Sequence, residues 1–358
     1  MGAPGSVNST ITDMCATGPG AGDTIVFLDG TYDTSDASVN LDGRTIRIEN
    51  KNCGTASNMI VLRSQSKHGA VINVDGLPVN GTDAAAFKPI NSSYLRIEDF
   101  FIEGNQQAGQ LFGPGVETQG SHHIEVVGNH IEDTVGGGVT TQQSTHIYIA
   151  DNDIIRGAWQ HPNCSSNISF YQHTNPMSFP DDANGYSNYI INNRVYSSDN
   201  LNFAGCFSSQ PSDGNCVIID VSNELGYYAN HTLVAGNVCV DNGGRGLQSL
   251  SSSHIDFYNN TVYLNVQTTQ PYTSNLMVTC DDRDSGFGST DINFVGNVVQ
   301  RNPGTDTFRS AQFNSGNDCP LDVDFQNNVF IDDYISSSTF AGGISINTTT
   351  DITDLDTC

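Results

Sequence analysis

Eight residues indicate the fold of this chain: Ile124-Glu-Val-Val-Gly-Asn-His-Ile131. Apolar and polar residues alternate before the asparagine, which is the period of a β-strand. The template, apolar–x–apolar–x–x–Asn–x–apolar, returns in full at 147–154, 255–262, 292–299 and 323–330, and less strictly at 190–195 and 232–239. Recurrence of this kind indicates stacked copies of one small structural unit.

The spacing of the copies defines that unit. The repeated asparagines are Asn129, Asn152, Asn193, Asn237, Asn260, Asn297 and Asn328, which lie 23, 41, 44, 23, 37 and 31 residues apart. A coil of 23 residues with loops inserted in some coils explains every gap. The sequence therefore predicts an all-β, single-domain parallel β-helix over residues 21–335. We expect a cap at 1–20, a tail or cap at 336–358, and large insertions at about 156–187 and 198–215.

The repeated polar residues have a structural interpretation. An asparagine at a sharp bend tolerates a left-handed backbone and can bond a stacked neighbour. Four histidines, His123, His146, His231 and His254, each lie six residues before a repeated asparagine. Stacking would place such residues about 4.8 Å apart, where zinc is the alternative to turn chemistry. The regular offset favours turn chemistry, so no metal site is predicted.

Composition excludes several classes of function. Acidic residues outnumber basic ones 39 to 13, giving a net charge of −26. Such a surface repels phosphates and anionic lipids, so we expect neither nucleic acid nor a membrane as a partner. No apolar run approaches the ~20 residues of a membrane helix. Nine scattered cysteines without a Cys-x-x-Cys pair predict disulfides in a secreted protein, with at least one thiol unpaired. We expect the protein to be a monomer.

A second class of strand lies between the repeats and alternates in the same way. Its predicted inward column contains Val116, Val139, Ile168, Val217, Leu247, Met277 and Ala311. One outward column contains Glu117, Thr140, Ser169, Ile218, Gln248, Val278 and Gln312. The other contains Gln119, Gln142, Tyr171, Asp220, Leu250, Cys280 and Asn314. A strip rich in amides and hydroxyls suits a polyol chain, so Glu117, Gln119, Gln142, Ser169 and Gln248 are predicted to bind substrate; a plain solvated face is the alternative.

The longest interruption of this strip, between Ile168 and Val217, carries further candidates. Functional residues often lie on long insertions beside a rigid scaffold. Trp159, His173 and Asp182 are therefore predicted to bind substrate, the tryptophan by stacking on a sugar ring; simple packing of the tryptophan is the alternative.

At this point the chain resembles the right-handed parallel β-helix, or pectin-lyase-like, superfamily of carbohydrate-active proteins. The resemblance is carried by Ala-Gly-Asp-Thr-Ile-Val-Phe-Leu-Asp-Gly-Thr-Tyr at 21–32, and by the segments 212–220, 242–247 and 251–263. It implies the right-handed fold and action on a polysaccharide. It leaves the reaction open, because the superfamily holds lyases, hydrolases, epimerases and adhesins.

The residues favour hydrolysis over elimination. Lyases of this superfamily typically use a lysine or arginine base, often with calcium, and residues 89–358 contain no lysine. Glycoside hydrolysis needs two carboxyl groups, about 5–5.5 Å apart for retention or about 6.5–9.5 Å for inversion. We expect Asp220 and Asp213 to be this pair, brought within range by a bend in the turn before the strand, with neither assigned as the acid. The alternatives are Asp181 or Asp182 reaching across from the large loop, or a plain turn at Asp213 and a solvent-facing Asp220. Tyr171 is expected to tune a carboxylate, and Arg245 to orient a carboxylate or the substrate.

Two alternatives stay open. A calcium-assisted uronate lyase would use Arg245, Tyr171 or His173; for a hydrolase no cofactor is required. The only calcium candidate in the sequence, Asp281, Asp282 and Asp284, lacks the spacing of a twelve-residue calcium loop and is interpreted as a turn. The other alternative is a non-catalytic, glycan-binding β-helix.

Overall fold

The protein is described by a computed structural model. The described residues are 6–34, 36, 38–39, 45–74, 85–104, 113–158, 165–174, 179–198, 213–223, 228–266, 274–279, 288–300, 309–314, 321–331, 335–336 and 342–346. Of the residues singled out in the sequence, Trp159, Cys280 and the Asp281, Asp282 and Asp284 group lie outside them.

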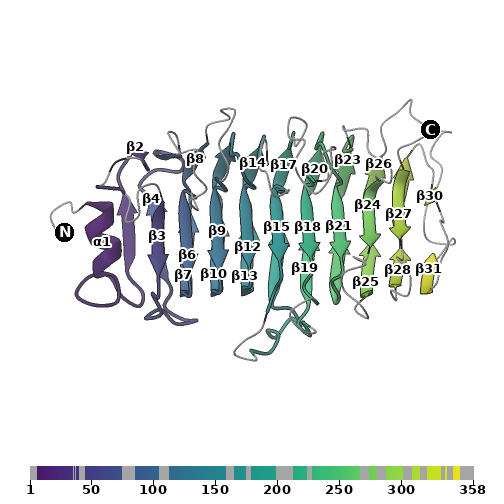
Figure 1. Ribbon diagram of the computed structural model, residues 1–358, viewed down its shortest axis with the longest axis horizontal. Helices are drawn as coiled ribbons and strands as arrows, with labels where there is room; N and C mark the ends of the chain where they lie inside the picture. Colours follow the sequence, from purple (N-terminus) through teal and green to yellow (C-terminus); the bar gives the residue numbers. More distant parts are fainter. Residues whose placement is uncertain are drawn as a thin grey trace.

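The strands form three parallel sheets that run the length of the molecule (Figure 1). Sheet A contains, in order, β1 (Thr24–Phe27), β4 (Ile60–Ser64), β7 (Ser93–Glu98), β10 (His122–Val127), β13 (Thr145–Ala150), β16 (Asn188–Ile191), β19 (Thr232–Ala235), β22 (Ile255–Tyr258), β25 (Ser289–Val295), β28 (Leu321–Gln326) and β31 (Gly342–Ile346). Sheet B contains β2 (Gly30–Asp33), β5 (Ala70–Asn73), β8 (Phe101–Glu103), β11 (His130–Glu132), β14 (Asp153–Ile155), β17 (Arg194–Tyr196), β20 (Val238–Val240), β23 (Thr261–Tyr263), β26 (Val298–Gln300) and β29 (Val329–Ile331). Sheet C contains β3 (Ile46–Glu49), β6 (Phe87–Ile90), β9 (Val116–Gln119), β12 (Val139–Gln142), β15 (Ile168–Tyr171), β18 (Val217–Asp220), β21 (Leu247–Leu250), β24 (Ser274–Thr279), β27 (Arg309–Asn314) and β30 (Ile335–Ser336).

The order of strands confirms the predicted parallel β-helix. Each strand pairs with the strand three places before and three places after it, so every coil adds one strand to each sheet. Parallel crossovers are right-handed in nearly all proteins, in agreement with the expected hand. The repeated asparagine motif spans the end of a sheet A strand and the start of a sheet B strand, and the second strand class forms sheet C.

The two ends differ in construction. Helix α1 (Val7–Asp13) lies at the N-terminal end of the stack and buries Ile11 in the common core (Figure 1). A disulfide, Cys15–Cys53, ties the segment after this helix to the first coils. At the other end, β31 lies within the predicted C-terminal tail and pairs with β28, so the sheets continue past residue 335. Among the described residues, no helix has the length and apolar character that crossing a bilayer requires.

The interior is filled by columns of apolar side chains, one per coil. The ring of Phe294 stacks between those of Phe257 and Phe325, with centroids 4.6 and 4.9 Å away. These side chains are almost completely buried, so in-register stacking removes a continuous apolar surface from water, which stabilises the coil.

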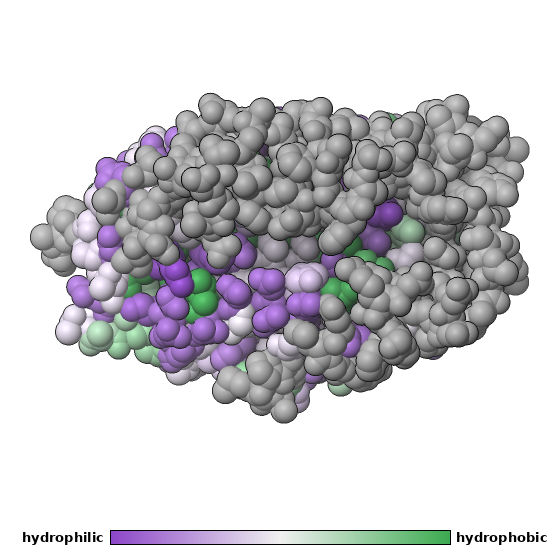
Figure 2. All heavy atoms as spheres, viewed as in Figure 1, coloured by the Kyte–Doolittle hydropathy of each residue, from purple (hydrophilic) through white to green (hydrophobic). Residues whose placement is uncertain are grey.

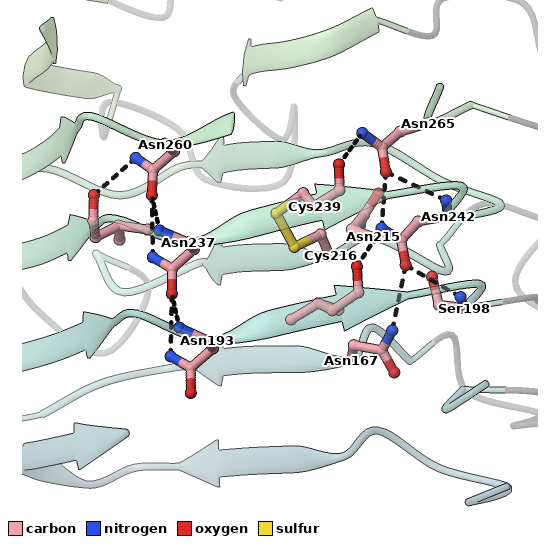
Figure 3. The surroundings of a disulfide bond; sticks show 12 residues. Asn167, Asn193, Ser198, Asn215, Cys216, Asn237, Cys239, Asn242, Asn260 and Asn265 are labelled. Atoms are coloured by element: carbon pink, nitrogen blue, oxygen red, sulfur yellow. Dashed lines mark hydrogen bonds between the residues drawn. A yellow bond between two sulfur atoms is a disulfide. The ribbon is translucent and has the colours of Figure 1, made fainter. Parts of the chain in front are cut away.

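The repeated asparagines form a buried ladder, shown in part in Figure 3. Backbone N and Nδ2 of Asn193 both donate to Oδ1 of Asn237, which donates in the same way to Asn260. The predicted bonding to stacked neighbours is confirmed. The predicted left-handed backbone belongs instead to the residue before each asparagine, such as Gly236 with φ 66°. That residue makes the bend, and the asparagine satisfies the polar groups that the bend leaves inside.

A second disulfide lies beside this ladder (Figure 3). Cys216, directly before β18, is bonded to Cys239 in β20, and both are fully buried. The predicted use of cysteine for disulfides is therefore confirmed at two pairs. This one links sheet C to sheet B close to the candidate site.

Candidate functional site

The outer face of sheet C carries the two predicted columns. Across β9, β12, β15, β18 and β21, the register aligns Glu117, Thr140, Ser169, Ile218 and Gln248. It likewise aligns Gln119, Gln142, Tyr171, Asp220 and Leu250. Over these five coils the prediction is confirmed, because the strands alternate strictly and every coil keeps the same register.

One coil further, the predicted alignment is wrong by one residue. Leu276, not Met277, pairs with Leu247 and points inward, while Met277 pairs with Gln248 on the outer face. The second outward column therefore continues with Thr279, and Val278 turns inward. A slip of one residue exchanges the two faces of a strand.

Exposure separates the middle of this face from its two ends. Seven polar side chains are partly exposed and form what we term the polar strip: Glu117, Gln119, Thr140, Gln142, Ser169, Tyr171 and Asp220. On the N-terminal side Lys88 is only 2% exposed, and on the C-terminal side Gln248 is 4% exposed. Figure 2, in the orientation of Figure 1, shows that the coloured residues on this side are mostly hydrophilic. The outward column that contains Glu117, Thr140 and Ser169 is thus buried on both sides of the strip, and Gln248 belongs to its buried C-terminal part.

Lys88 was missed as a member of this face. It lies on β6 beside Glu117, and its Nζ is 3.1 Å from Glu117 Oε1. The outer face therefore contains a lysine, one coil before the first predicted member. Because Lys88 is buried and paired with a carboxylate, it neutralises Glu117 at the edge of the strip.

The C-terminal end of the strip combines a phenol and a carboxylate. Tyr171 and Asp220 are register neighbours at the ends of β15 and β18. Neighbouring parallel strands lie about 4.8 Å apart, so the two side chains stand side by side on the outer face. The structure thus brings together the predicted carboxylate and the residue predicted to tune it.

Asp213 and Arg245 form a separate cluster at the opposite end of β18. Asp213 Oδ1 accepts a hydrogen bond of 3.1 Å from Asn215 Nδ2, and Asn215 Oδ1 accepts one of 2.7 Å from the backbone N of Arg245. Asn215 Nδ2 and Arg245 Nη1 both donate to Oε1 of Gln248, each at 3.2 Å. Burial lowers the pKa of Arg245, and the nearby carboxylate of Asp213 opposes that shift. The Cys216–Cys239 disulfide holds this end of the strand.

The two predicted catalytic carboxylates are therefore not in contact. Asp220 is the last residue of β18, whereas Asp213 precedes its first residue, Val217. At about 3.3 Å per residue, the strand alone separates its ends by roughly 10 Å. Asp213 and Asp220 lie at opposite ends of one strand of the same sheet.

His173 does not face a substrate, which corrects its predicted role. It is 1% exposed, its ring centroid lies 4.3 Å from that of Phe170 inside the coil, and its Nε2 lies 2.7 Å from Thr141 Oγ1. Burial lowers its pKa to about 3. The left-handed residue Gln172, with φ 49°, turns the chain after β15 and redirects the next side chain inward.

Asp182 is not on the polar strip either. Its Oδ1 accepts a hydrogen bond of 2.7 Å from the backbone N of Asn184, and its Oδ2 accepts one from the hydroxyl of Tyr189 on sheet A. These bonds lower the pKa of Asp182 against the opposing effect of its partial burial. Its position indicates a role in shaping the turn before β16.

The histidine column lies at the corner that leads from sheet C into sheet A. Its two halves have different surroundings: His123 and His146 stack at 4.5 Å, whereas His231 and His254 lie within 4.8 Å of the carboxylate of Asp291, measured between ligand atoms. Among the described residues, only this second group collects three side chains that could hold a metal ion.

No protein-family model and no curated protein matches the chain. Among solved structures, it is similar to the A-module of a mannuronan C-5 epimerase from Azotobacter vinelandii, with 13% identity and a TM-score of 0.44 over 97% of this chain and 93% of that one. It is also similar to an alginate lyase from Paenibacillus sp. str. FPU-7, with 15% identity and a TM-score of 0.43 over 98% of both chains. It is similar as well to a rhamnogalacturonan lyase, with 12% identity and a TM-score of 0.47 over 94% of this chain and 80% of that one. At these values none of the three bears on the reaction.

Proposed function

We propose that the protein is a secreted enzyme that cleaves a polysaccharide by glycoside hydrolysis, with the sugar chain lying along the polar strip. The observation that carries the proposal is the strip itself, where hydroxyl, amide and carboxylate groups stay partly exposed between buried ends. The groups repeat at the strand spacing of about 4.8 Å, close to the length of one pyranose residue in an extended glycan.

The charge of the protein narrows the substrate. With a net charge of −26, the molecule repels polyanions in general. The one lysine on the described part of this face is paired with Glu117. These features favour a neutral or weakly acidic polysaccharide.

The separation of the two carboxylates favours inversion over retention of configuration at the anomeric carbon. Asp213 and Asp220 lie at the two ends of β18, whose length is roughly 10 Å. This length exceeds the separation of about 5–5.5 Å found in retaining enzymes and lies nearer to the separation of about 6.5–9.5 Å found in inverting ones. In this proposal one carboxylate protonates the leaving oxygen, and the other activates a water molecule on the opposite face of the sugar.

The neighbours of the two carboxylates support different roles. Tyr171 beside Asp220 can donate a hydrogen bond that favours the ionised carboxylate, which suits a general base. Asp213 lies next to the partly buried Arg245, within a hydrogen-bonded cluster that fixes its position. Gln119, Gln142 and Ser169 would bind sugar hydroxyls along the strip.

Elimination on a uronate is the second candidate, and one observation favours it. Tyr171 is adjacent to Asp220 at the exposed end of the strip, and a phenol can accept or deliver the protons that elimination requires. His173, which was a further candidate for the lyase reaction, is excluded because it is buried and cannot contact the substrate.

A panel of polysaccharides separates the two reactions. The protein is incubated with each, and reducing ends are measured together with the ultraviolet absorbance of unsaturated sugars. New reducing ends without absorbance support hydrolysis, and the first anomer seen by NMR should then be inverted. Both signals rising together would overturn hydrolysis in favour of elimination. No product from any glycan that the protein binds would support a non-catalytic binding protein.

Secretion rests on the two disulfides, Cys15–Cys53 and Cys216–Cys239, because such bonds persist in oxidising compartments. The test is to titrate thiols in protein purified from the culture medium of its native host and unfolded without reductant. We expect these four cysteines to be unreactive; reactive thiols at these positions, or protein found only inside cells, would contradict secretion.

A further inference from the structure

Three coils place potential metal ligands at one corner of the helix. The register of sheet A aligns Thr232 with Ile255 and Ile255 with Ile292. The residues directly before them, His231, His254 and Asp291, therefore occupy the same position in successive coils. Stacking at about 4.8 Å per coil brings their side chains together without any loop having to fold over them.

The distances between these side chains fit a small ion. Asp291 Oδ2 lies 2.6 Å from His254 Nδ1 and 3.6 Å from His231 Nε2. Zinc binds such atoms at about 2.0–2.1 Å, so a tetrahedral site needs ligand atoms about 3.3 Å apart. The two observed distances bracket that value, and all three ligand atoms lie within 4.8 Å of one another.

A fourth side chain orients one of the ligands. Asp181 Oδ2 lies 2.8 Å from His231 Nδ1, on the opposite side of the imidazole from Asp291. Asp181 is itself held by Ser187, whose Oγ donates to Oδ1 at 2.7 Å. A carboxylate that accepts from Nδ1–H leaves the lone pair on Nε2, which is the arrangement found behind metal-bound histidines.

The corresponding histidine pair three coils earlier, His123 and His146, has no carboxylate that forms a metal-binding group with it among the described residues. His123 stacks between Tyr94 and His146, each centroid 4.5 Å away, with the ring of Phe179 5.1 Å away. The pKa of His123 is lowered to about 4 by burial and by the neighbouring histidines. The chain thus contains the same histidine pair twice, once packed by aromatic rings and once surrounded by carboxylates.

We propose that His231 Nε2, His254 Nδ1 and Asp291 Oδ2 bind one divalent cation of the zinc class, with Asp181 orienting His231. Two imidazoles and one carboxylate suit zinc and its first-row neighbours, whereas calcium prefers a shell of oxygens. Three protein ligands leave one coordination position for water. The ion would join three successive coils of sheet A, and this proposal is independent of the proposed reaction.

The test uses the untagged full chain, stripped with a chelator, dialysed against Zn²⁺ and analysed for bound metal. We expect the wild type to hold one more zinc per chain than His254→Ala. The matched control, His146→Ala, removes a histidine of the same column and should hold as much zinc as the wild type. Equal zinc in the wild type and a folded His254→Ala protein, or loss of one zinc in His146→Ala, would overturn the proposal.

A second variant covers a failure of His254→Ala to fold. Asp291→Asn keeps the shape of the side chain and removes the charged ligand oxygen, so it should also hold one zinc less. Zn²⁺ should raise the melting temperature of the wild type, and the rise should be absent from Asp291→Asn. An equal rise in both proteins would contradict the site.

Discussion

The asparagine ladder and the outward column of sheet C both contribute one side chain per coil, and they differ in how often the residue type changes from coil to coil. The asparagine ladder keeps the same residue in seven coils, from Asn129 to Asn328, and lies buried at a bend of the chain. The outward column of sheet C changes at almost every coil, from Gln142 through Tyr171 and Asp220 to Leu250. Repetition satisfies the backbone of a solenoid, whereas a change at one coil creates a local site. The histidine column combines both, because a repeated pair acquires carboxylates in one half only.

The largest expected effect is on the rate of cleavage and comes from the outward column of sheet C. Replacing Asp220 by Asn removes a proton acceptor without changing its shape, so we expect the rate of cleavage to fall about 10²–10⁴-fold. Asp213→Asn should do the same. The matched control is Asp153→Asn on sheet B, which removes a surface carboxylate paired with Arg194.

Reducing-end assays on the susceptible polysaccharide measure these rates, and thermal melts check the fold. Unchanged activity in folded Asp220→Asn protein would remove this residue from the reaction. A loss in the Asp153→Asn protein as large as that in Asp220→Asn would show that the assay reports stability and not chemistry.

The next effect concerns the repeating column and should appear in stability alone. Asn237→Ala leaves the buried donors of Asn193 without their acceptor and opens a gap below Asn260. Each unsatisfied buried group costs about 1–3 kcal/mol, so we expect a loss of at least about 2 kcal/mol in the free energy of unfolding. Denaturant titration measures it, with the exposed Gln326→Ala as control. A loss within about 0.5 kcal/mol, as for ordinary surface changes, would contradict the structural role of the ladder.

A smaller effect, on the affinity for Zn²⁺, tests the histidine column. Asp181→Asn keeps the metal ligands but weakens the acceptor behind His231, so the affinity for Zn²⁺ should fall about 10–100-fold. Competition with a chromophoric chelator gives the affinity. Wild-type affinity in this variant would show that Asp181 serves the turn and not the ion.

The smallest effect at neutral pH concerns the stability contribution of His173, which interrupts a column of serines. Ser92, Ser121 and Ser144 continue as Ser222 and Ser252 along the turn after sheet C, and His173 occupies the position between the third and the fourth. Burial lowers the pKa of His173 to about 3, so the unfolded chain binds the proton more tightly than the folded one. Stability should therefore decline as the pH falls from about 6.5 toward 3.

The variant His173→Ser, which restores the repeat, should lack this part of the acid destabilisation. Melts of both proteins between neutral and acid pH measure the difference. Parallel curves for the two proteins would show that His173 takes up its proton in the folded state at its ordinary pKa.

The fold and most of the outer face of sheet C could be predicted because alternation and a fixed coil length leave few choices. Prediction failed where alternation stops. Leu276-Met277-Val278 is apolar throughout, so it allows either register, and the left-handed turn at Gln172 sends His173 inward in a way that alternation does not encode. Lys88 was missed because its strand carries a proline and no repeat motif.

Asp291 could have been found from the sequence. It lies six residues before Asn297, the same offset that identified the four histidines. The offset marks a position in the coil and not a residue type, so a carboxylate can occupy it as well as a histidine. Asp181 could not be found in this way, because it reaches His231 from the segment before β16.

Glycan binding and cleavage at the polar strip on sheet C is the central claim. The most direct test is a crystal structure of the Asp220→Asn protein with an oligosaccharide of the polysaccharide that the panel identifies. We predict sugar rings along the strip, with a glycosidic oxygen between residues 213 and 220 and hydroxyls on Gln142 and Ser169. Sugar bound on another face of the helix, with the strip bare, would contradict the claim.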